Sequence, residues 1–172
     1  MTDRADALAG AVMVRRADIL SPAAQALIGS LNAELSSTYA DLPATCHFRL
    51  DAEEVADGRG AFLIASRSAT PVGCGALRRI DPRTGEIKRM YVAPEQRGRG
   101  VGRAILAAIE AEARALGLRR LVLETGTRQA EALALYHRAG FSRIEPFGEY
   151  VASPLSVCMA KELGDTGTSA FR

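Results

Sequence analysis

Glycine and arginine alternate between Arg97 and Gly102, and the residue types of this segment point most clearly to chemistry. It follows a strand-like run at 87–92 and passes directly into a helix-like run at 103–116. Glycine lets main-chain N–H groups approach an anion closely, and the first N–H groups of a helix have no partner within that helix. The arginines within the segment, and Arg103, add positive charge. The segment therefore predicts a site for the phosphate or diphosphate group of a nucleotide-bearing cofactor.

Two other kinds of phosphate-binding loop have spacings that this segment does not reproduce. A P-loop requires Lys and then Ser or Thr after its last glycine, but Gly102 is followed by Arg103, which excludes that class. A dinucleotide-binding loop fits Gly98 and Gly100 but requires a third glycine where Arg103 stands. Glu124 ends the next strand-like run, about where a ribose-binding acid would lie. A dinucleotide-binding domain is therefore kept as an alternative.

The pattern Arg97-x-x-Gly100-x-Gly102 resembles the acyl-CoA diphosphate loop of the GNAT family (GCN5-related N-acetyltransferases). Two further segments carry the resemblance in the family's order. Residues 86–94 (EIKRMYVAP) resemble the fourth strand that leads into the loop, and residues 135–141 (LYHRAGF) resemble the family's LY…GF signature. The resemblance implies an enzyme that moves an acetyl group from acetyl-CoA to a primary amine by direct attack on the thioester.

The resemblance also implies which residues hold the cofactor. Main-chain groups of the strand would pair with the pantetheine arm and face the oxyanion, and the N–H groups of the loop would hold the diphosphate. Gln129 stands where many relatives have Asn, and it keeps the capacity to donate and accept hydrogen bonds. Tyr136 matches a tyrosine that lies against the CoA sulfur, where its phenol would protonate the leaving thiolate. The cofactor-binding residues implied are Met90, Tyr91, Val92, Arg97, Gly98, Arg99, Gly100, Val101, Gly102, Arg103, Gln129 and Tyr136.

Tyr136 and Glu86 are the expected catalytic pair. Glu86 lies eleven residues before Arg97, the position of the general base in some histone-acetylating relatives. If Glu86 faces the cleft, strict alternation along the strand places it on one face with Lys88, Met90 and Val92. Other candidates for the base stay open, namely Glu124 at the end of the strand beside the cofactor and an ordered water molecule.

Local patterns predict an α/β fold, with a mixed, mostly antiparallel central sheet and helices on both faces, as in an acyl-CoA N-acyltransferase-like sandwich. A strand–helix–strand unit around 103–116 predicts one parallel pair of strands. Ser21-Pro22 would begin the first helix, and Gly117 would end the helix that follows the loop. The expected strands are 12–16, 61–65, 72–80, 86–92, 120–124, 141–144 and 155–161, and the expected helices are 23–39, 52–55, 103–116 and 129–139.

Length and composition restrict the class of protein to which this chain can belong. A chain of 172 residues predicts one domain over 11–163, with flexible ends at 1–10 and 164–172. A net charge of +2 gives no reason to expect nucleic acid or a membrane as partner, and no apolar run approaches the length that spans a membrane. We expect a cytoplasmic protein with buried free thiols and no metal, because the cysteines and histidines lack metal-ligand spacing. These residues are Cys46, Cys74, Cys158, His47 and His137.

The sequence gives the least information on the chemical identity of the acceptor. The resemblance places its pocket among residues 31–50 and 145–154, where Glu149 would attract a cationic amine. No long acidic surface suited to a basic protein tail is evident, so a small molecule is favoured, such as an amino acid or a related amine. An acetyltransferase for protein or peptide amines is one alternative, and a non-catalytic acyl-CoA-binding module is another. The resemblance leaves open whether the protein forms a homodimer.

Overall fold

The computed structural model describes residues 10–42 and 50–164. The predicted flexible ends therefore lie almost entirely outside the described residues, as do Cys46 and His47. The elements, in chain order, are β1 (Val12–Arg16), α2 (Pro22–Thr38), η1 (Ala52–Val55), β2 (Gly60–Arg67), β3 (Thr70–Arg79), β4 (Thr84–Val92), η2 (Pro94–Gln96), α3 (Val101–Ala115), β5 (Arg120–Gly126), α4 (Ala130–Arg138), β6 (Ser142–Ile144), η3 (Gly148–Tyr150) and β7 (Ser156–Glu162). The η elements are short 3₁₀ helices.

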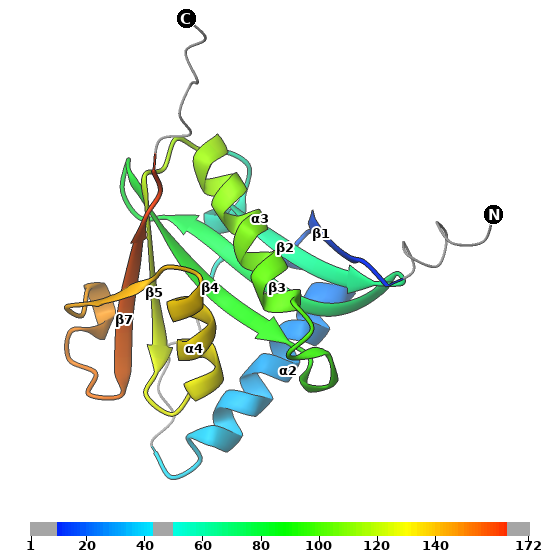
Figure 1. Ribbon diagram of the computed structural model, residues 1–172, viewed down its shortest axis with the longest axis horizontal. Helices are drawn as coiled ribbons and strands as arrows, with labels where there is room; N and C mark the ends of the chain where they lie inside the picture. The colour runs from blue at the N-terminus through cyan, green and yellow to red at the C-terminus, as the bar shows by residue number, and fades with distance from the viewer. Residues whose placement is uncertain (1–9, 43–49, 165–172) are drawn as a thin grey trace, which may run out of the picture.

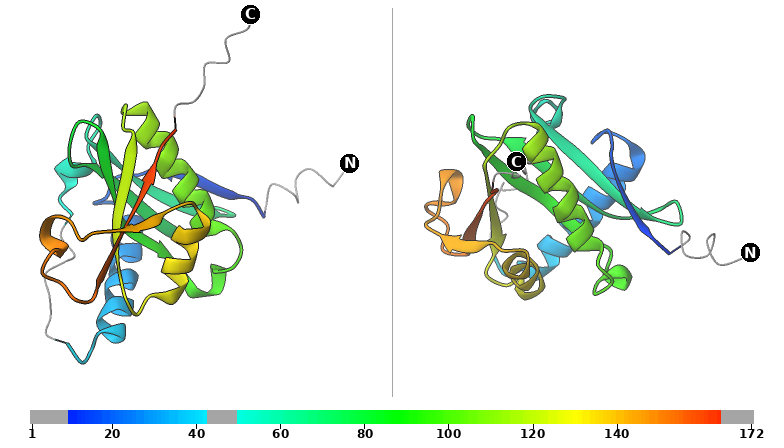
Figure 2. Two further views of the ribbon diagram at one scale, coloured as in Figure 1. Left: turned by 60° about the vertical axis from the view of Figure 1, so that its left-hand side comes forward. Right: turned by 45° about the horizontal axis from the view of Figure 1, so that its top comes forward.

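The strands form one sheet in the order β1-β2-β3-β4-β5-β7-β6. Strands β4 and β5 run parallel because the chain crosses over through α3, and every other neighbouring pair is antiparallel. Figure 1 shows α3 and α4 on one face of the sheet and α2 behind it, and the turned views of Figure 2 agree. The predicted α/β fold with a mixed, mostly antiparallel sheet and helices on both faces is confirmed.

Each face of the sheet has its own apolar core. Helix α3 buries Val101, Ile105 and Ile109 against one face, in the cluster that also holds Ile87 and Leu123. Helix α2 packs a smaller cluster on the other face. This helix begins as predicted, with the Ser21 hydroxyl accepting a hydrogen bond from the Ala24 N–H and Pro22 in its first turn. Cys74 and Cys158 are free and buried, as expected.

Strands β4 and β5 pair along only part of their length. Their register runs from Thr84 opposite Arg120 to Ile87 opposite Leu123, although β4 continues to Val92 and β5 to Gly126. Beyond that point the outer edge of β4 still pairs with β3, and the outer edge of β5 still pairs with β7. The two facing edges diverge into the V visible in Figure 1. Main-chain donors and acceptors along these edges are therefore available to another molecule.

A β-bulge in β4 shifts the alternation of its side chains. Between Lys88 and Tyr91 two residues of β4 lie opposite the single residue Gly75 of β3, and Arg89 has φ +56°. Met90 consequently packs with the α3 cluster, whereas Tyr91 packs with the α2 cluster. The prediction that Glu86, Lys88, Met90 and Val92 share one face is wrong, because strict alternation does not continue through a bulge.

Gly75 gives the residues of the bulge room to pack, so its replacement tests this arrangement. A Cβ at Gly75 would lie 2.7 Å from Ile105 Cγ2 and 2.8 Å from the Met90 sulfur. We expect Gly75→Ala to lower the free energy of unfolding by about 1–3 kcal/mol through overpacking, as measured by chemical denaturation. Gly29→Ala is the control, because Gly29 lies in α2 with nothing within 4 Å of its Cβ position. We expect it to stabilise the protein by about 0.5–1 kcal/mol, and equal effects of the two changes would contradict this packing.

Candidate active site

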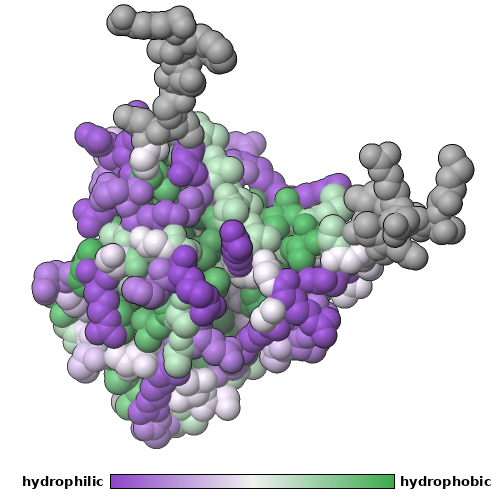
Figure 3. All heavy atoms as spheres, viewed as in Figure 1, coloured by the Kyte–Doolittle hydropathy of each residue, from purple (hydrophilic) through white to green (hydrophobic). Residues whose placement is uncertain are grey.

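A cleft of about 910 Å³ lies where β4 and β5 diverge. It reaches both faces of the sheet, because Met90 and Tyr136 belong to the face covered by α3 and α4, whereas Leu31 belongs to α2 on the other face. Figure 3 shows apolar residues gathered in the middle of the face that carries α3 and α4, with polar residues around them. The lining residues are Leu31, Leu35, Ser36, Tyr39, Ala40, Leu42, Ile87, Lys88, Arg89, Met90, Glu124, Thr125, Gly126, Gln129, Tyr136, Glu149, Tyr150, Ala152, Ser153, Pro154, Leu155 and Ser156.

The loop before α3 has the geometry of an anion-binding site. Gly98 and Gly100 have φ +72° and +82°, a left-handed conformation that glycine adopts without steric cost. Gly100 is also the N-cap of α3, whose first residue, Val101, lies two residues before the predicted start of the helix at 103. Within 10–42 and 50–164, no N–H group from Gly98 to Arg103 donates a hydrogen bond to the protein. These donors and the positive end of the helix dipole favour a bound phosphate.

The three arginines of the loop region differ in their roles. The Arg97 side chain donates to the Val92 carbonyl at 2.9 Å and to the Glu34 carboxylate at 2.7 Å, so it ties the loop to β4 and α2. We expected the positive charge of Arg97 to act on the anion directly. Its side chain is instead held by hydrogen bonds to β4 and α2. Arg99 and Arg103 are exposed at the loop and are the cations left to approach a diphosphate.

Helix α4 places Tyr136 and Gln129 on the cleft wall. Tyr136 is only 5% exposed and packs edge-on against Phe141, with ring centroids 5.9 Å apart, which gives the LY…GF signature a packing role. Burial raises the pKa of Tyr136 well above its ordinary value, and the nearby Glu124 carboxylate raises it further. The phenol therefore stays protonated at neutral pH and is able to donate a proton. The Gln129 side-chain oxygen accepts a hydrogen bond from the Thr125 hydroxyl at 3.0 Å.

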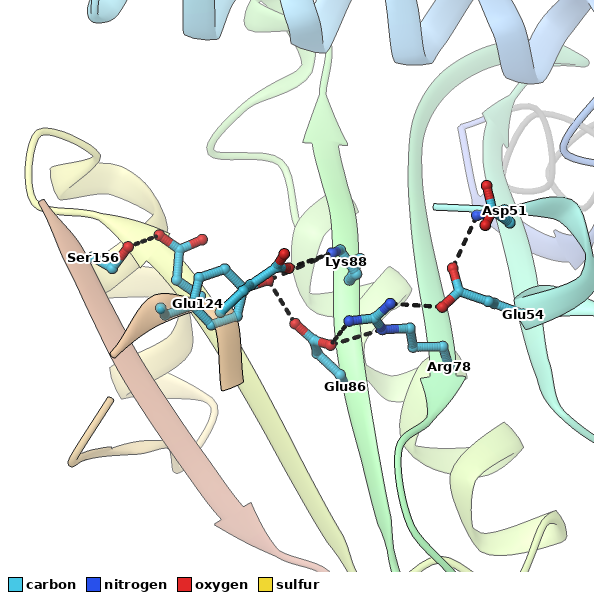
Figure 4. Close-up of polar contacts among 9 residues, drawn as sticks. Asp51, Glu54, Arg78, Glu86, Lys88, Glu124 and Ser156 are labelled. Atoms are coloured by element: carbon cyan, nitrogen blue, oxygen red, sulfur yellow. Dashed lines mark hydrogen bonds and ion pairs between the residues drawn. The ribbon is translucent and has the colours of Figure 1, made fainter. Parts of the chain in front are cut away.

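Glu86 is buried behind the cleft and is not one of its lining residues. Its side chain is 1% exposed, and Arg78 donates to one oxygen from Nε at 2.8 Å and from Nη2 at 2.7 Å. The Tyr150 hydroxyl donates to the other oxygen at 2.8 Å. Figure 4 shows this network continuing from Arg78 to Glu54. Both oxygens of Glu86 thus have strong donors, and Tyr150 is the group of this network that reaches the cleft.

Of Arg78 and Tyr150, which both contact Glu86, Arg78 was not predicted for the site, whereas Tyr150 lies in the predicted acceptor segment 145–154. Arg78 lies directly opposite Glu86 in the β3–β4 register, so pairing the expected strands 72–80 and 86–92 as a hairpin would have indicated this contact. The contact of Tyr150 with Glu86 gives no comparable signal, because Tyr150 reaches Glu86 from η3, sixty-four residues further along the chain. The predicted acceptor segment 145–154 does contribute to the cleft, and the predicted segment 31–50 contributes through Leu31 to Leu42, its residues 43–49 lying outside the described residues.

Glu124 is the carboxylate of β5 that lines the cleft. The Ser156 hydroxyl donates to one of its oxygens at 2.7 Å, as Figure 4 shows. Glu124 follows Leu123, the last residue of β5 that pairs with β4, so it stands at the point where the strands part. Among the residues that the structure describes, no group of three or more His, Cys, Asp or Glu side chains is arranged to hold a metal ion.

Three features occur together here: an anion-binding loop, an opened pair of parallel strands and a protonated tyrosine on the cleft wall. This combination is expected of a transferase that uses an acyl-CoA. Residues 27–141 match the model of the Acetyltransferase (GNAT) family. The chain is 45% identical over 154 residues to "IAA acetyltransferase" of Azospirillum brasilense, covering 88% of this chain and 98% of that protein.

Solved structures agree with this assignment. A provisionally assigned acyl-CoA N-acyltransferase from Klebsiella pneumoniae has a TM-score of 0.77 at 33% identity, covering 89% of this chain and 98% of the other. The paia N-acetyltransferase of Thermoplasma acidophilum, solved with coenzyme A, shares the fold with a TM-score of 0.67 at 18% identity, covering 89% and 99%.

The chain belongs to the GNAT acetyltransferase family. It is an N-acetyltransferase that uses acetyl-CoA as acyl donor, as the resemblance implied. The alternative of a dinucleotide-binding domain is wrong, because that fold is built on a mostly parallel sheet, whereas among the strands that the structure describes only β4 and β5 are parallel. No helix among the described residues is long and apolar enough to cross a membrane.

The left-handed glycine at the start of α3 allows a matched test of the loop. Gly100 and Gly117 flank the two ends of α3 with φ +82° and +74°, and neither has an atom within 4 Å of its Cβ position. Alanine at either position costs about 1–2 kcal/mol of stability. We expect only Gly100→Ala to weaken coenzyme A binding, by about tenfold or more in calorimetry, which corresponds to about 1.4 kcal/mol. Equal weakening by Gly117→Ala would show that stability, and not the loop, controls binding.

Proposed function

We propose that this enzyme transfers the acetyl group of acetyl-CoA to a primary amine of a small molecule, such as an amino acid or a related amine. The observation that carries the proposal is the cleft that passes between β4 and β5. On one face it meets Tyr136 and the anion-binding loop, and on the other it meets α2 and the η3 segment. Cofactor and acceptor would thus enter from opposite faces and meet in the gap.

Contacts beside the acceptor side of the cleft support the choice of a small molecule. Arg128, beside β5, donates to the Asp41 carboxylate at 2.6 and 3.0 Å and lies over the Tyr39 ring at 5.3 Å. These contacts hold the C-terminal end of α2 against the rim of the cleft. An extended peptide would need an open groove at this rim, so the arrangement favours a small molecule. The Azospirillum brasilense relative is named for a small-molecule acceptor, which supports the same choice. A protein or peptide amine is the alternative.

In the proposed reaction the amine attacks the thioester carbonyl directly. Glu124 takes the proton from the amine, either directly or through a water molecule, because it lines the cleft where the strands part. Freed main-chain N–H groups of β4 face the oxyanion. Tyr136 donates its proton as the C–S bond breaks and the thiolate leaves. We assign Glu124 this role in place of Glu86, since Glu86 lies outside the cleft lining and already accepts hydrogen bonds at both oxygens.

Substitution of the proposed acid and base tests this assignment. We expect Tyr136→Phe and Glu124→Gln each to lower kcat by about 10²-fold or more, the range of general acid–base catalysis, with a much smaller effect on acetyl-CoA binding. Thiol release is measured with acetyl-CoA and a panel of amino acids, polyamines, aminoglycosides and peptides. A non-catalytic acyl-CoA-binding module would release no thiol above background with any of them. Full activity in Glu124→Gln together with inactive Glu86→Gln would return the role of base to Glu86.

The protonation of Tyr136 gives an expectation for alkaline pH. An ordinary tyrosine loses its proton near pH 10. Since burial raises the pKa of Tyr136, its acid form persists above that pH, and kcat should rise as the amine loses its proton and then stay level to about pH 10.5. The measurement is kcat at saturating substrates, with circular dichroism as a check that the protein stays folded. A fall in kcat centred near pH 10 would contradict the proposed state of Tyr136.

A further inference from the structure

Lys88 is a buried cation on the wall of the cleft. Its side chain is 7% exposed, so nine-tenths of it is shielded from bulk water. Within the part of the chain that the structure describes, its ammonium lies 3.4 Å from the Tyr150 hydroxyl oxygen and 3.6 Å from a Glu149 oxygen. An ammonium carries three donors, and a separation of 3.6 Å is too long for a hydrogen bond. A buried ammonium with so few close acceptors favours an anionic partner in the cavity that it faces.

Tyr150 and Glu149 engage only part of the hydrogen-bonding capacity of the Lys88 ammonium. The Tyr150 hydroxyl donates its proton to Glu86 at 2.8 Å and accepts one long hydrogen bond from Lys88 at 3.4 Å, which leaves two of the three ammonium donors to other acceptors. The Glu149 side chain is 51% exposed and so keeps much of its contact with water. A carboxylate that keeps this much contact with water, at 3.6 Å, neutralises the buried ammonium only in part. The network shown in Figure 4 therefore fixes the position of Lys88 and leaves donors of its ammonium facing the cleft.

The register of the strands places Lys88 next to Glu124. Ile87 and Leu123 form the last pair of β4 and β5, and both side chains pack into the α3 core. The next residue on each strand, Lys88 and Glu124, therefore points to the opposite face, because side chains alternate along a strand. Both line the cleft. A cation and a carboxylate thus stand on neighbouring strands at the position where the gap opens.

We propose that Lys88 binds a carboxylate of the acceptor while the acceptor's amine lies toward Glu124, so that the enzyme selects amines that carry an anionic group, as amino acids do. This inference rests on the proposed function. The half-buried Arg89 lines the same part of the cleft and adds to its positive potential. An acceptor with several cationic groups, such as a polyamine, would place a second positive charge against Lys88 and bind poorly.

Matched acceptors test the inference directly. We would measure kcat and KM for amino acids, for their carboxamides, and for the corresponding amines without the carboxyl group. The wild-type enzyme should prefer the carboxylate member of a set by about tenfold to 100-fold in kcat/KM, the range of a charge-assisted hydrogen bond.

Substitution of Lys88 then links this preference to its ammonium. In Lys88→Met the preference should disappear through a higher KM for the carboxylate member, with the carboxamide little affected, and Lys88→Arg should keep part of it. Lys161→Met is the control, because Lys161 pairs with Glu110 at 2.6 Å and is not a lining residue of the cleft. It should leave the preference unchanged.

The outcomes separate this inference from the proposed function. A wild-type enzyme that accepts both members of each set equally, or turns over only amines without an anionic group, overturns the role of Lys88. An equal loss on both members in Lys88→Met also overturns it, because such a loss indicates a merely structural lysine. Absence of acetyl transfer to every amine tested would instead contradict the proposed function itself.

Discussion

Strands β4 and β5 pair only as far as Ile87 and Leu123, although both strands continue beyond that point. Each is held at its outer edge by an antiparallel neighbour, so the facing edges part without loss of either strand. Two consequences follow from this one constraint. Main-chain groups become available along the gap for the amide-bearing arm of an acyl-CoA, and the side chains next in sequence, Lys88 and Glu124, stand at its entrance.

Packing and polar contacts on both faces hold the gap open. On one face, the bulge at Arg89 turns Met90 toward α3, where Gly75 leaves room for it. On the other face, the buried Glu86 pairs with the partly buried Arg78 and accepts a hydrogen bond from Tyr150. Burial of such charges is costly unless their hydrogen bonds are satisfied, and here both Glu86 oxygens have donors. The network connects β3, β4 and η3, so the wall of the acceptor side is fixed before any ligand arrives.

The elements and the anion-binding loop were predictable from sequence because they depend on local patterns. Glycines at 98 and 100, a cap at Ser21 and periodic apolar residues in α3 each leave a signal within a few positions. The bulge left no such signal, and strict alternation therefore placed Met90 on the wrong face. The partners of Glu86 illustrate a second limit. Arg78 follows from hairpin register, whereas Tyr150 comes from a distant 3₁₀ turn that only the folded chain brings close.

A crystal structure with a non-hydrolysable acetyl-CoA analogue is the most direct test of cofactor binding at the loop before α3 and in the gap between β4 and β5. We expect the diphosphate to lie within hydrogen-bond distance of the N–H groups between Gly98 and Arg103. We also expect the pantetheine arm to be hydrogen-bonded to the facing edges of β4 and β5, with the thioester beside Tyr136. A ligand bound elsewhere, or a β4–β5 ladder that continues through Lys88 and Glu124 and closes the gap, would contradict it.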